Sequence, residues 1–253
     1  AARLDLVLGS RAGRHRVPLD GVTPWTARRE CAVSGVMEPM TVMNERASEE
    51  RRFWDRFAPR YDRFMARFAG VYSQLGDRIQ LELDSNDRVL EIATGTGLIA
   101  LEISRYVSAV TAIDISEPMI KVARGKARSA NIKNVDFQVE DAYALSFEDE
   151  QFDVCLIVNA LHVMQQPDVV LRKARRVLKP AGRLIAPTYC HGQNGKSRVV
   201  SRLMGLFGFK VYSRFSIRSY SDALTANGFH ITDLHVFAGT PPLACPMAEK
   251  QSH

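Results

Sequence analysis

The residues best suited to chemistry stand where predicted strands end. The segment Glu91-Ile92-Ala93-Thr94-Gly95-Thr96-Gly97 places two glycines after a strand, and bare glycine backbone lets a ligand lie close against the chain. Asp114 ends the next strand, 23 positions after Glu91 (114 − 91 = 23). A carboxylate there can accept hydrogen bonds from both hydroxyls of a ribose, each contributing about 1.5–3 kcal/mol. The pattern therefore predicts a nucleoside-binding crevice at one edge of a parallel sheet.

Three classes of ligand fit such a crevice, and two of them meet objections. Residues 190–197 approach a phosphate-binding loop, but Cys190 stands where that loop needs its first glycine. A nicotinamide dinucleotide would use residues 95–100, which follow the pattern G-x-G-x-x-A, together with Asp114. Glu91 would then set a carboxylate beside a pyrophosphate, and the chain holds no Tyr-x-x-x-Lys pair of the short-chain dehydrogenase type. An NAD(P)-dependent oxidoreductase stays open as an alternative.

S-adenosylmethionine accounts for the polar residues that remain. It carries an ammonium and a sulfonium but no phosphate, so Glu91 beside the glycine loop becomes favourable. Asp141 follows the third predicted strand, where a carboxylate can accept from the adenine amino group. Asn159 follows the fourth strand and would face the methionine end. The ordered set is more specific than any one member, and it predicts S-adenosylmethionine as the cofactor, with no metal.

At this point the chain resembles the class I S-adenosylmethionine-dependent methyltransferases, especially the ubiquinone/menaquinone branch that acts on small molecules. The resemblance covers roughly residues 50–245, and its motifs are Val89-Leu90-Glu91-Ile92-Ala93-Thr94-Gly95-Thr96-Gly97, Ala112-Ile113-Asp114-Ile115-Ser116, Phe152-Asp153-Val154 and Arg176-Val177-Leu178-Lys179-Pro180-Ala181-Gly182. Phe57-Ala58-Pro59-Arg60-Tyr61-Asp62 looks like the entry helix of that branch, in which the tyrosine closes over the cofactor.

The resemblance implies a cofactor site and leaves two departures. Ala93 replaces the first loop glycine of the family, and Pro246 falls in the segment after Thr240 that should form the antiparallel last strand. The expected cofactor-binding residues are Tyr61, Glu91, Ala93, Thr94, Gly95, Gly97, Asp114, Ile115, Met119, Asp141, Ala142, Asn159 and Ala160.

Alternating strands and helices must position these residues. They predict an α/β fold, a Rossmann-like doubly wound sheet that is mostly parallel, with an antiparallel last strand and helices on both faces. Residues 46–253 are expected to form one domain, with entry helices interrupted at Pro59 and a lid insert near 190–215. Residues 1–45 are expected to be a poorly ordered basic extension. The predicted strands are 88–93, 109–113, 135–139, 152–158, 183–186 and 229–237, and the predicted helices begin near 49, 71, 98, 116, 168, 197 and 219.

Methyl transfer from a sulfonium needs in-line alignment more than acid–base groups, so no catalytic residue is assigned. His162 and His191 are candidates for a base, against the alternative of loop histidines that only form hydrogen bonds. His162, Tyr189, Leu203 and Phe207 are candidates for the acceptor pocket, while Trp54 is expected to be core.

The expected partner is a small apolar or aromatic methyl acceptor. The basic amphipathic insert could close over it, touch a membrane surface, or simply cover the sheet edge. A net charge of +6 is weak support for nucleic acid, and no Asn/Asp-Pro-Pro-Tyr motif follows the fourth strand. Four cysteines without metal spacing and the lack of a signal peptide favour the cytoplasm. A non-catalytic module that binds S-adenosylmethionine is a further alternative.

Overall fold

A computed structural model describes residues 40–206 and 210–251 of the chain. Residues 1–39, which hold most of the predicted extension, lie outside the described residues, and α1 already begins at Met40. The helices are α1 (Met40–Met65), η1 (Ala66–Phe68), α2 (Ala69–Gln80), α3 (Leu98–Ile103), η2 (Ser104–Tyr106), α4 (Glu117–Ser129), η3 (Leu161–Val163), α5 (Pro167–Val177), α6 (Gly195–Leu206) and α7 (Ile217–Ala226). The strands are β1 (Arg88–Ile92), β2 (Ala109–Asp114), β3 (Val135–Val139), β4 (Phe152–Leu156), β5 (Leu178–Ile185), β6 (Thr188–Tyr189), β7 (Phe229–Phe237) and β8 (Leu243–Lys250).

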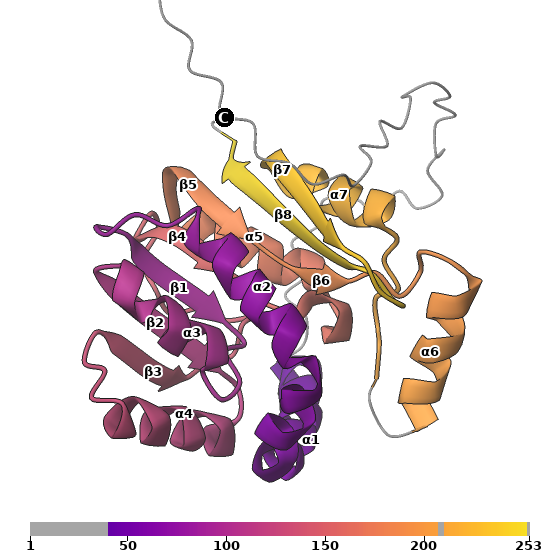
Figure 1. Cartoon of the computed structure of the whole chain (residues 1–253), viewed down its shortest axis with the longest axis horizontal. Coiled ribbons are helices and arrows are strands. Elements are labelled where there is room, and N and C mark those ends of the chain that lie inside the picture. Colours follow the sequence, from indigo (N-terminus) through magenta and orange to yellow (C-terminus); the bar gives the residue numbers. More distant parts are fainter. Residues whose placement is uncertain (1–39, 207–209, 252–253) are drawn as a thin grey trace, which may run out of the picture. The chain divides into compact units, whose positions relative to one another are not determined.

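The strands form one sheet in the order β3-β2-β1-β4-β5-β8-β6, with β7 paired to β8 (Figure 1). The pairs from β3 to β5 are parallel, whereas β8 runs antiparallel to β5, β6 and β7. The predicted mostly parallel sheet with an antiparallel end is therefore confirmed. The strand order reverses between β1 and β4, and ligands of such sheets bind in the crevice at that point.

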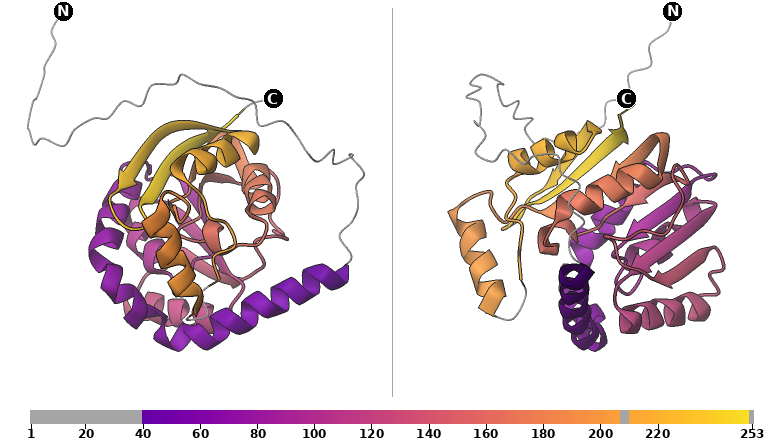
Figure 2. Two further views of the ribbon diagram at one scale, coloured as in Figure 1. Left: turned by 90° about the vertical axis from the view of Figure 1, so that its right-hand side faces the viewer. Right: turned by 180° about the vertical axis from the view of Figure 1, so that it is seen from behind.

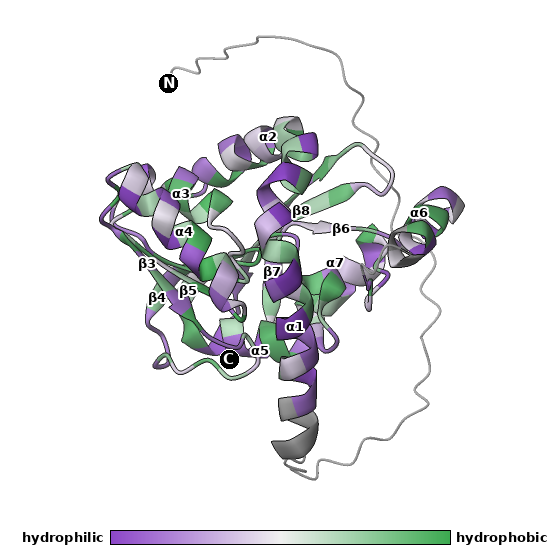
Figure 3. Ribbon diagram, turned by 90° about the horizontal axis from the view of Figure 1, so that it is seen from below, coloured by the Kyte–Doolittle hydropathy of each residue, from purple (hydrophilic) through white to green (hydrophobic). Residues whose placement is uncertain are grey.

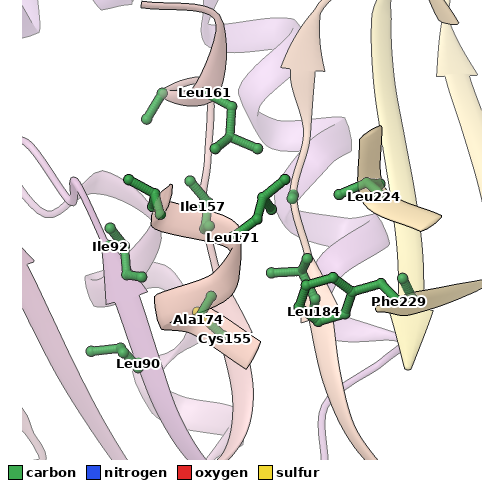
Figure 4. Close-up of a cluster of buried hydrophobic side chains, with 14 of the residues drawn as sticks. Leu90, Ile92, Cys155, Ile157, Leu161, Leu171, Ala174, Leu184, Leu224 and Phe229 are labelled. Atoms are coloured by element: carbon green, nitrogen blue, oxygen red, sulfur yellow. The ribbon is translucent and has the colours of Figure 1, made fainter. Parts of the chain in front are cut away.

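Buried side chains alternate between the two faces of the sheet, as the two-residue period of a strand requires. Leu90 and Ile92 belong to a core cluster with α5 and α7, while Val89 of the same strand belongs to a cluster with α2, α3 and α4. Figure 4 shows the first cluster, with Leu171 and Ala174 of α5 facing the sheet residues. The helices thus cover both faces, and the two additional views show their placement (Figure 2).

Local signals fix the helix that follows β2. The Ser116 side chain accepts a hydrogen bond from the Met119 N–H and caps α4, which was predicted to begin near this residue. Met119, Ile120, Ala123 and Ala127 are its buried residues and recur at helical spacing. The start of α4 is therefore held directly behind the end of β2, where Asp114 stands.

Pro246 lies inside β8, between two neighbouring strands. Its carbonyl accepts a hydrogen bond from Ala186 N–H, which follows β5. A residue in an antiparallel strand points its nitrogen and its carbonyl to the same neighbour. The missing N–H of Pro246 therefore faces the break between β5 and β6, where no ladder bond is lost.

Two predicted boundaries were wrong. The strand expected to begin at residue 183 already begins at Leu178, which pairs with Phe152, and Ala181 adopts φ +57° at a bulge within β5. The entry helix is not interrupted at Pro59, which lies inside α1. Proline there removes one backbone hydrogen bond, and the helix nevertheless continues, with the centroids of the Phe57 and Phe64 rings on either side of it 5.5 Å apart.

Hydropathy varies from face to face along the helices (Figure 3). Among residues 40–206 and 210–251, no helix combines the length and the apolar character that crossing a bilayer requires.

Candidate cofactor and acceptor site

A cleft opens at the carboxyl ends of β1 to β4. Figure 1 shows α1 running past these strand tips, and Glu50, Trp54 and Tyr61 of that helix line the cleft. Trp54 was expected to be core, so its place in the cleft wall corrects that expectation. Ten of the thirteen predicted cofactor residues also line it: Tyr61, Ala93, Gly95, Asp114, Ile115, Met119, Asp141, Ala142, Asn159 and Ala160.

Asp114 is held by backbone donors on two sides. Its carboxylate accepts the N–H of Gly95 at 2.8 Å and the N–H of Ser116 at 2.9 Å. The residue is 8% exposed, and this burial, partly offset by the two hydrogen bonds, raises the pKa of Asp114 to about 6. The carboxylate is thus fixed in position, with lone pairs left for donors that enter the cleft.

The loop after β1 adopts an unusual backbone. Ala93, Gly95 and Gly97 have φ of +59°, +57° and +77°. A Cβ at Gly97 would come within 2.8 Å of the Phe137 ring, so that position has no room for a side chain. The Tyr61 ring lies 3.4 Å from where a Cβ of Gly95 would stand, so α1 packs closely over the loop.

Glu91 and Thr94 lie beneath the loop rather than in the cleft wall. Glu91 is 2% exposed and accepts a hydrogen bond from the Thr94 hydroxyl at 2.5 Å. Its carboxylate also accepts the backbone N–H of Ala100, in the first turn of α3. Burial raises the pKa of Glu91 to about 7, although these hydrogen bonds oppose the shift. Glu91 therefore supports the loop directly and can act on a bound cation only through its charge.

The carboxylate of Asp141 already has a partner that the sequence did not suggest. The Arg46 guanidinium forms ion pairs with Asp141 and with Glu50, the latter at 2.7 Å, and lies 3.7 Å from the centroid of the Tyr143 ring. Burial raises the pKa of Glu50 to about 7, against the lowering effect of Arg46. Residues 46, 50 and 54 repeat every four positions, which is the only sequence signal that they share a face of α1.

Asn159 contributes a polar atom without a partner. Its side-chain nitrogen donates to the Tyr72 hydroxyl at 2.8 Å, while its buried carbonyl oxygen has no hydrogen-bond partner among the described residues. The residue also adopts φ +53°, a left-handed conformation that asparagine accepts more readily than most residues.

The charges of the cleft agree with a cationic ligand. Four carboxylates line it, from Glu50, Asp114, Glu140 and Asp141, and no lysine or arginine lines it within the described part of the chain. A pyrophosphate would need cations or free backbone donors there, whereas an ammonium and a sulfonium are attracted. The donor set therefore fits S-adenosylmethionine better than a dinucleotide.

The acceptor candidates lie apart from this cleft. Tyr189 and His191 line a second cavity, next to His162, whose ring centroid is 5.1 Å from that of His191. His162 is 3% exposed and its Nδ1 lies 3.0 Å from the Thr188 hydroxyl. Leu203 on α6 is 52% exposed and lines neither cavity, and Phe207 lies outside the described residues.

Comparisons with known proteins agree with this geometry. A family described as "Methyltransferase domain" matches residues 90–186. The chain is 31% identical over 173 residues to the ubiquinone/menaquinone biosynthesis C-methyltransferase UbiE of Pseudomonas entomophila, an alignment that spans 66% of this chain and 66% of that protein. Against UbiE of Azotobacter vinelandii the identity is 32% over 180 residues, covering 68% of this chain and 67% of that protein.

The fold has solved counterparts as well. An S-adenosylmethionine-dependent methyltransferase structure from Thermotoga maritima superposes with a TM-score of 0.66 at 20% identity, over 79% of this chain and 99% of that one. The matched family spans β1 to β5, the part of the sheet that carries the cleft. The chain belongs to the class I S-adenosylmethionine-dependent methyltransferases, and within them it is related to the ubiquinone/menaquinone C-methyltransferases.

Proposed function

We propose that the chain transfers the methyl group of S-adenosylmethionine to a small apolar or aromatic molecule. The observation that supports this most is the Asp114 carboxylate, held by two backbone N–H groups beside the glycine loop in an acidic cleft. The names of the relatives favour a carbon atom of a quinone precursor as the methyl acceptor.

Each part of the cofactor has suitable residues in this proposal. Asp114 accepts from the ribose hydroxyls, and the free carbonyl oxygen of Asn159 accepts from the ammonium. Backbone around Ala142 and the Asp141 carboxylate lie where the adenine would bind. Tyr61 covers the loop from α1 and excludes water from the region between these groups.

The chemistry then depends on alignment. The bound sulfonium supplies an electrophilic methyl group, and the protein's task is to hold an acceptor atom in line with it. Such orientation can contribute about 7–11 kcal/mol to lowering the barrier. An acceptor with an acidic hydroxyl gains nucleophilicity when its proton is drawn toward a base.

Contact with a membrane surface is a finer part of the proposal. Val199 and Leu203 of α6 are 53% and 52% exposed, and the exposed Arg198 and Arg202 flank them. An apolar stripe edged by cations suits an anionic bilayer that supplies an apolar acceptor. Flotation with vesicles of anionic and of neutral lipid should show binding to the anionic ones, and Leu203→Ser should weaken it. Equal flotation of both proteins would contradict this part.

We also place the enzyme in the cytoplasm, since the described cysteines are free and buried.

Turnover tests the proposed function directly. Purified protein mixed with S-adenosylmethionine and a panel of hydroxylated aromatic acceptors should form S-adenosylhomocysteine, detected by mass spectrometry. Calorimetry with S-adenosylmethionine and with NADPH separates a methyltransferase from an oxidoreductase. Tight binding of S-adenosylmethionine without turnover on any acceptor would favour a non-catalytic binding module instead.

A further inference from the structure

The second cavity has a volume of about 400 Å³ and lies between α1, α2, α6 and the connection from β7 to β8. Its wall is mostly apolar, with Tyr189, His191 and Thr240 as the residues that bring polar side chains. The apolar side chains come from Phe64, Phe68, Val71, Val200, Phe237 and Leu243. A cavity of this size and character suits an apolar small molecule.

His191 is the unusual member of this wall. It is 1% exposed, and neither of its ring nitrogens has a hydrogen-bond partner among the described residues. Buried polar side chains nearly always have such partners, so an unpaired imidazole at a cavity points to a missing ligand. A neutral ring offers one N–H donor and one lone pair.

The backbone on both sides holds this ring in place. Cys190 N–H donates to the Pro242 carbonyl at 2.8 Å, and Gly192 N–H donates to the Phe215 carbonyl at 2.7 Å. A Cβ at Gly192 would come within 2.2 Å of the Arg214 carbonyl oxygen, so the chain passes there without spare room. The ring is therefore presented by a fixed segment rather than by a loose loop.

The ring is also uncharged at neutral pH. Burial, followed by the positive charge of Arg214, lowers the pKa of His191 to about 4. The neutral ring keeps a lone pair that no described residue engages, and a small rotation of the side chain would turn it toward a proton donor in the cavity.

The cavity adjoins the wall of the cofactor cleft. Val71 lines the cavity, and the next residue, Tyr72, accepts the hydrogen bond from Asn159 of the cleft. Tyr72 and Tyr189 pack against the same core cluster. A molecule in the cavity would therefore lie beyond the Tyr72–Asn159 pair as seen from the cofactor.

We propose that this cavity binds the apolar body of the methyl acceptor, and that His191 selects acceptors whose hydroxyl or enol group donates a hydrogen bond to its ring. The inference rests on the proposed function, because only methyl transfer makes the bound molecule an acceptor. Binding itself can be tested without turnover. His191 acts here as a specificity-determining residue.

The test uses the full chain and two fluorescent probes that share one ring system and differ by a single hydroxyl group, 1-naphthol and naphthalene. The natural protein should bind 1-naphthol more tightly, and His191→Phe should weaken 1-naphthol about five- to tenfold while leaving naphthalene within about twofold. His191→Gln, which keeps a polar group, should retain most of the preference. Val200→Arg should weaken both probes, and the exposed His230→Phe is the control that should change neither.

Several results would overturn the inference. One is that neither probe binds to the natural protein, and another is that the natural protein binds both probes equally. A third is that His191→Phe keeps the preference for 1-naphthol over naphthalene. If that variant does not fold, ring ¹⁵N shifts of His191 in the natural protein decide, since 1-naphthol must move them and naphthalene must not. Loss of methyl transfer on every acceptor, with the preference intact, would refute the proposed function and leave this site standing.

Discussion

Replacing Asp114 with asparagine tests the cofactor site at its most constrained point. The carboxylate accepts one backbone N–H on each oxygen, from Gly95 and Ser116. An amide keeps one of these bonds and turns an NH₂ group toward the other donor. One ribose hydroxyl then loses its charged acceptor, which costs about 1.5–3 kcal/mol of binding free energy, or about 10- to 150-fold in Kd.

The fold should tolerate this change better than binding does. Loss of one buried backbone hydrogen bond destabilises by about 1–3 kcal/mol. Burial already raises the pKa of Asp114 to about 6, so a neutral amide removes a desolvation cost and offsets part of that loss. Thermal melts should therefore show a folded variant with a modestly lower Tm.

Calorimetry with S-adenosylmethionine at pH 8 is the assay. Asp136→Asn is the matched control, because Asp136 is an exposed carboxylate on β3 outside the cleft. This variant should bind S-adenosylmethionine as tightly as the natural protein does. A folded Asp114→Asn variant with unchanged affinity would refute the placement of the ribose.

Other predictions concern titration and backbone conformation. The pKa values of Asp114 and Glu91 are raised by burial to about 6 and about 7, so protons favour the folded free protein, and the stability from these groups falls as pH rises through those values. Affinity for the cofactor should instead rise with pH, because the cation needs ionised carboxylates. Ionisation of Asp114 alone predicts a Kd about tenfold weaker at pH 5 than at pH 8. A Kd that does not change with pH would contradict this. Ala93→Gly should raise the free energy of unfolding by about 0.5–1 kcal/mol in urea titration, since alanine at φ +59° is strained by about 1–2 kcal/mol and glycine loses part of that gain to chain entropy. Gly97→Ala should lower the free energy of unfolding by about 2–4 kcal/mol, because the new Cβ contacts Phe137. Gly125→Ala in α4, where nothing lies within 4 Å of the new Cβ, should raise it by about 0.5–1 kcal/mol. Similar effects of both variants would be inconsistent with the loop geometry.

Features encoded by local sequence were predictable. The glycines after β1, Asp114 at the end of β2 and the cap at Ser116 each depend on neighbours within a few positions. Their meeting at one edge follows from the general rule that parallel strands end on the same side.

Features that depend on distant partners were not predictable. Arg46 lies 95 positions from Asp141, and nothing in either segment announces the ion pair. Pro59 suggested a break because proline destabilises a helix interior, yet α1 continues through it. The unpaired ring of His191 is defined by what surrounds it in space, which no spacing of residues encodes.

The path of α1 bears on how fast the protein can work. Glu50, Trp54 and Tyr61 place this single unbroken helix along the cleft wall, and Arg46 ties it to the far side at Asp141. We expect a nucleoside held beside the helix to leave more slowly while those charged contacts are in place. We therefore expect Arg46→Ala to shorten the residence time of the spent cofactor, measured by stopped-flow release, without changing the chemical step.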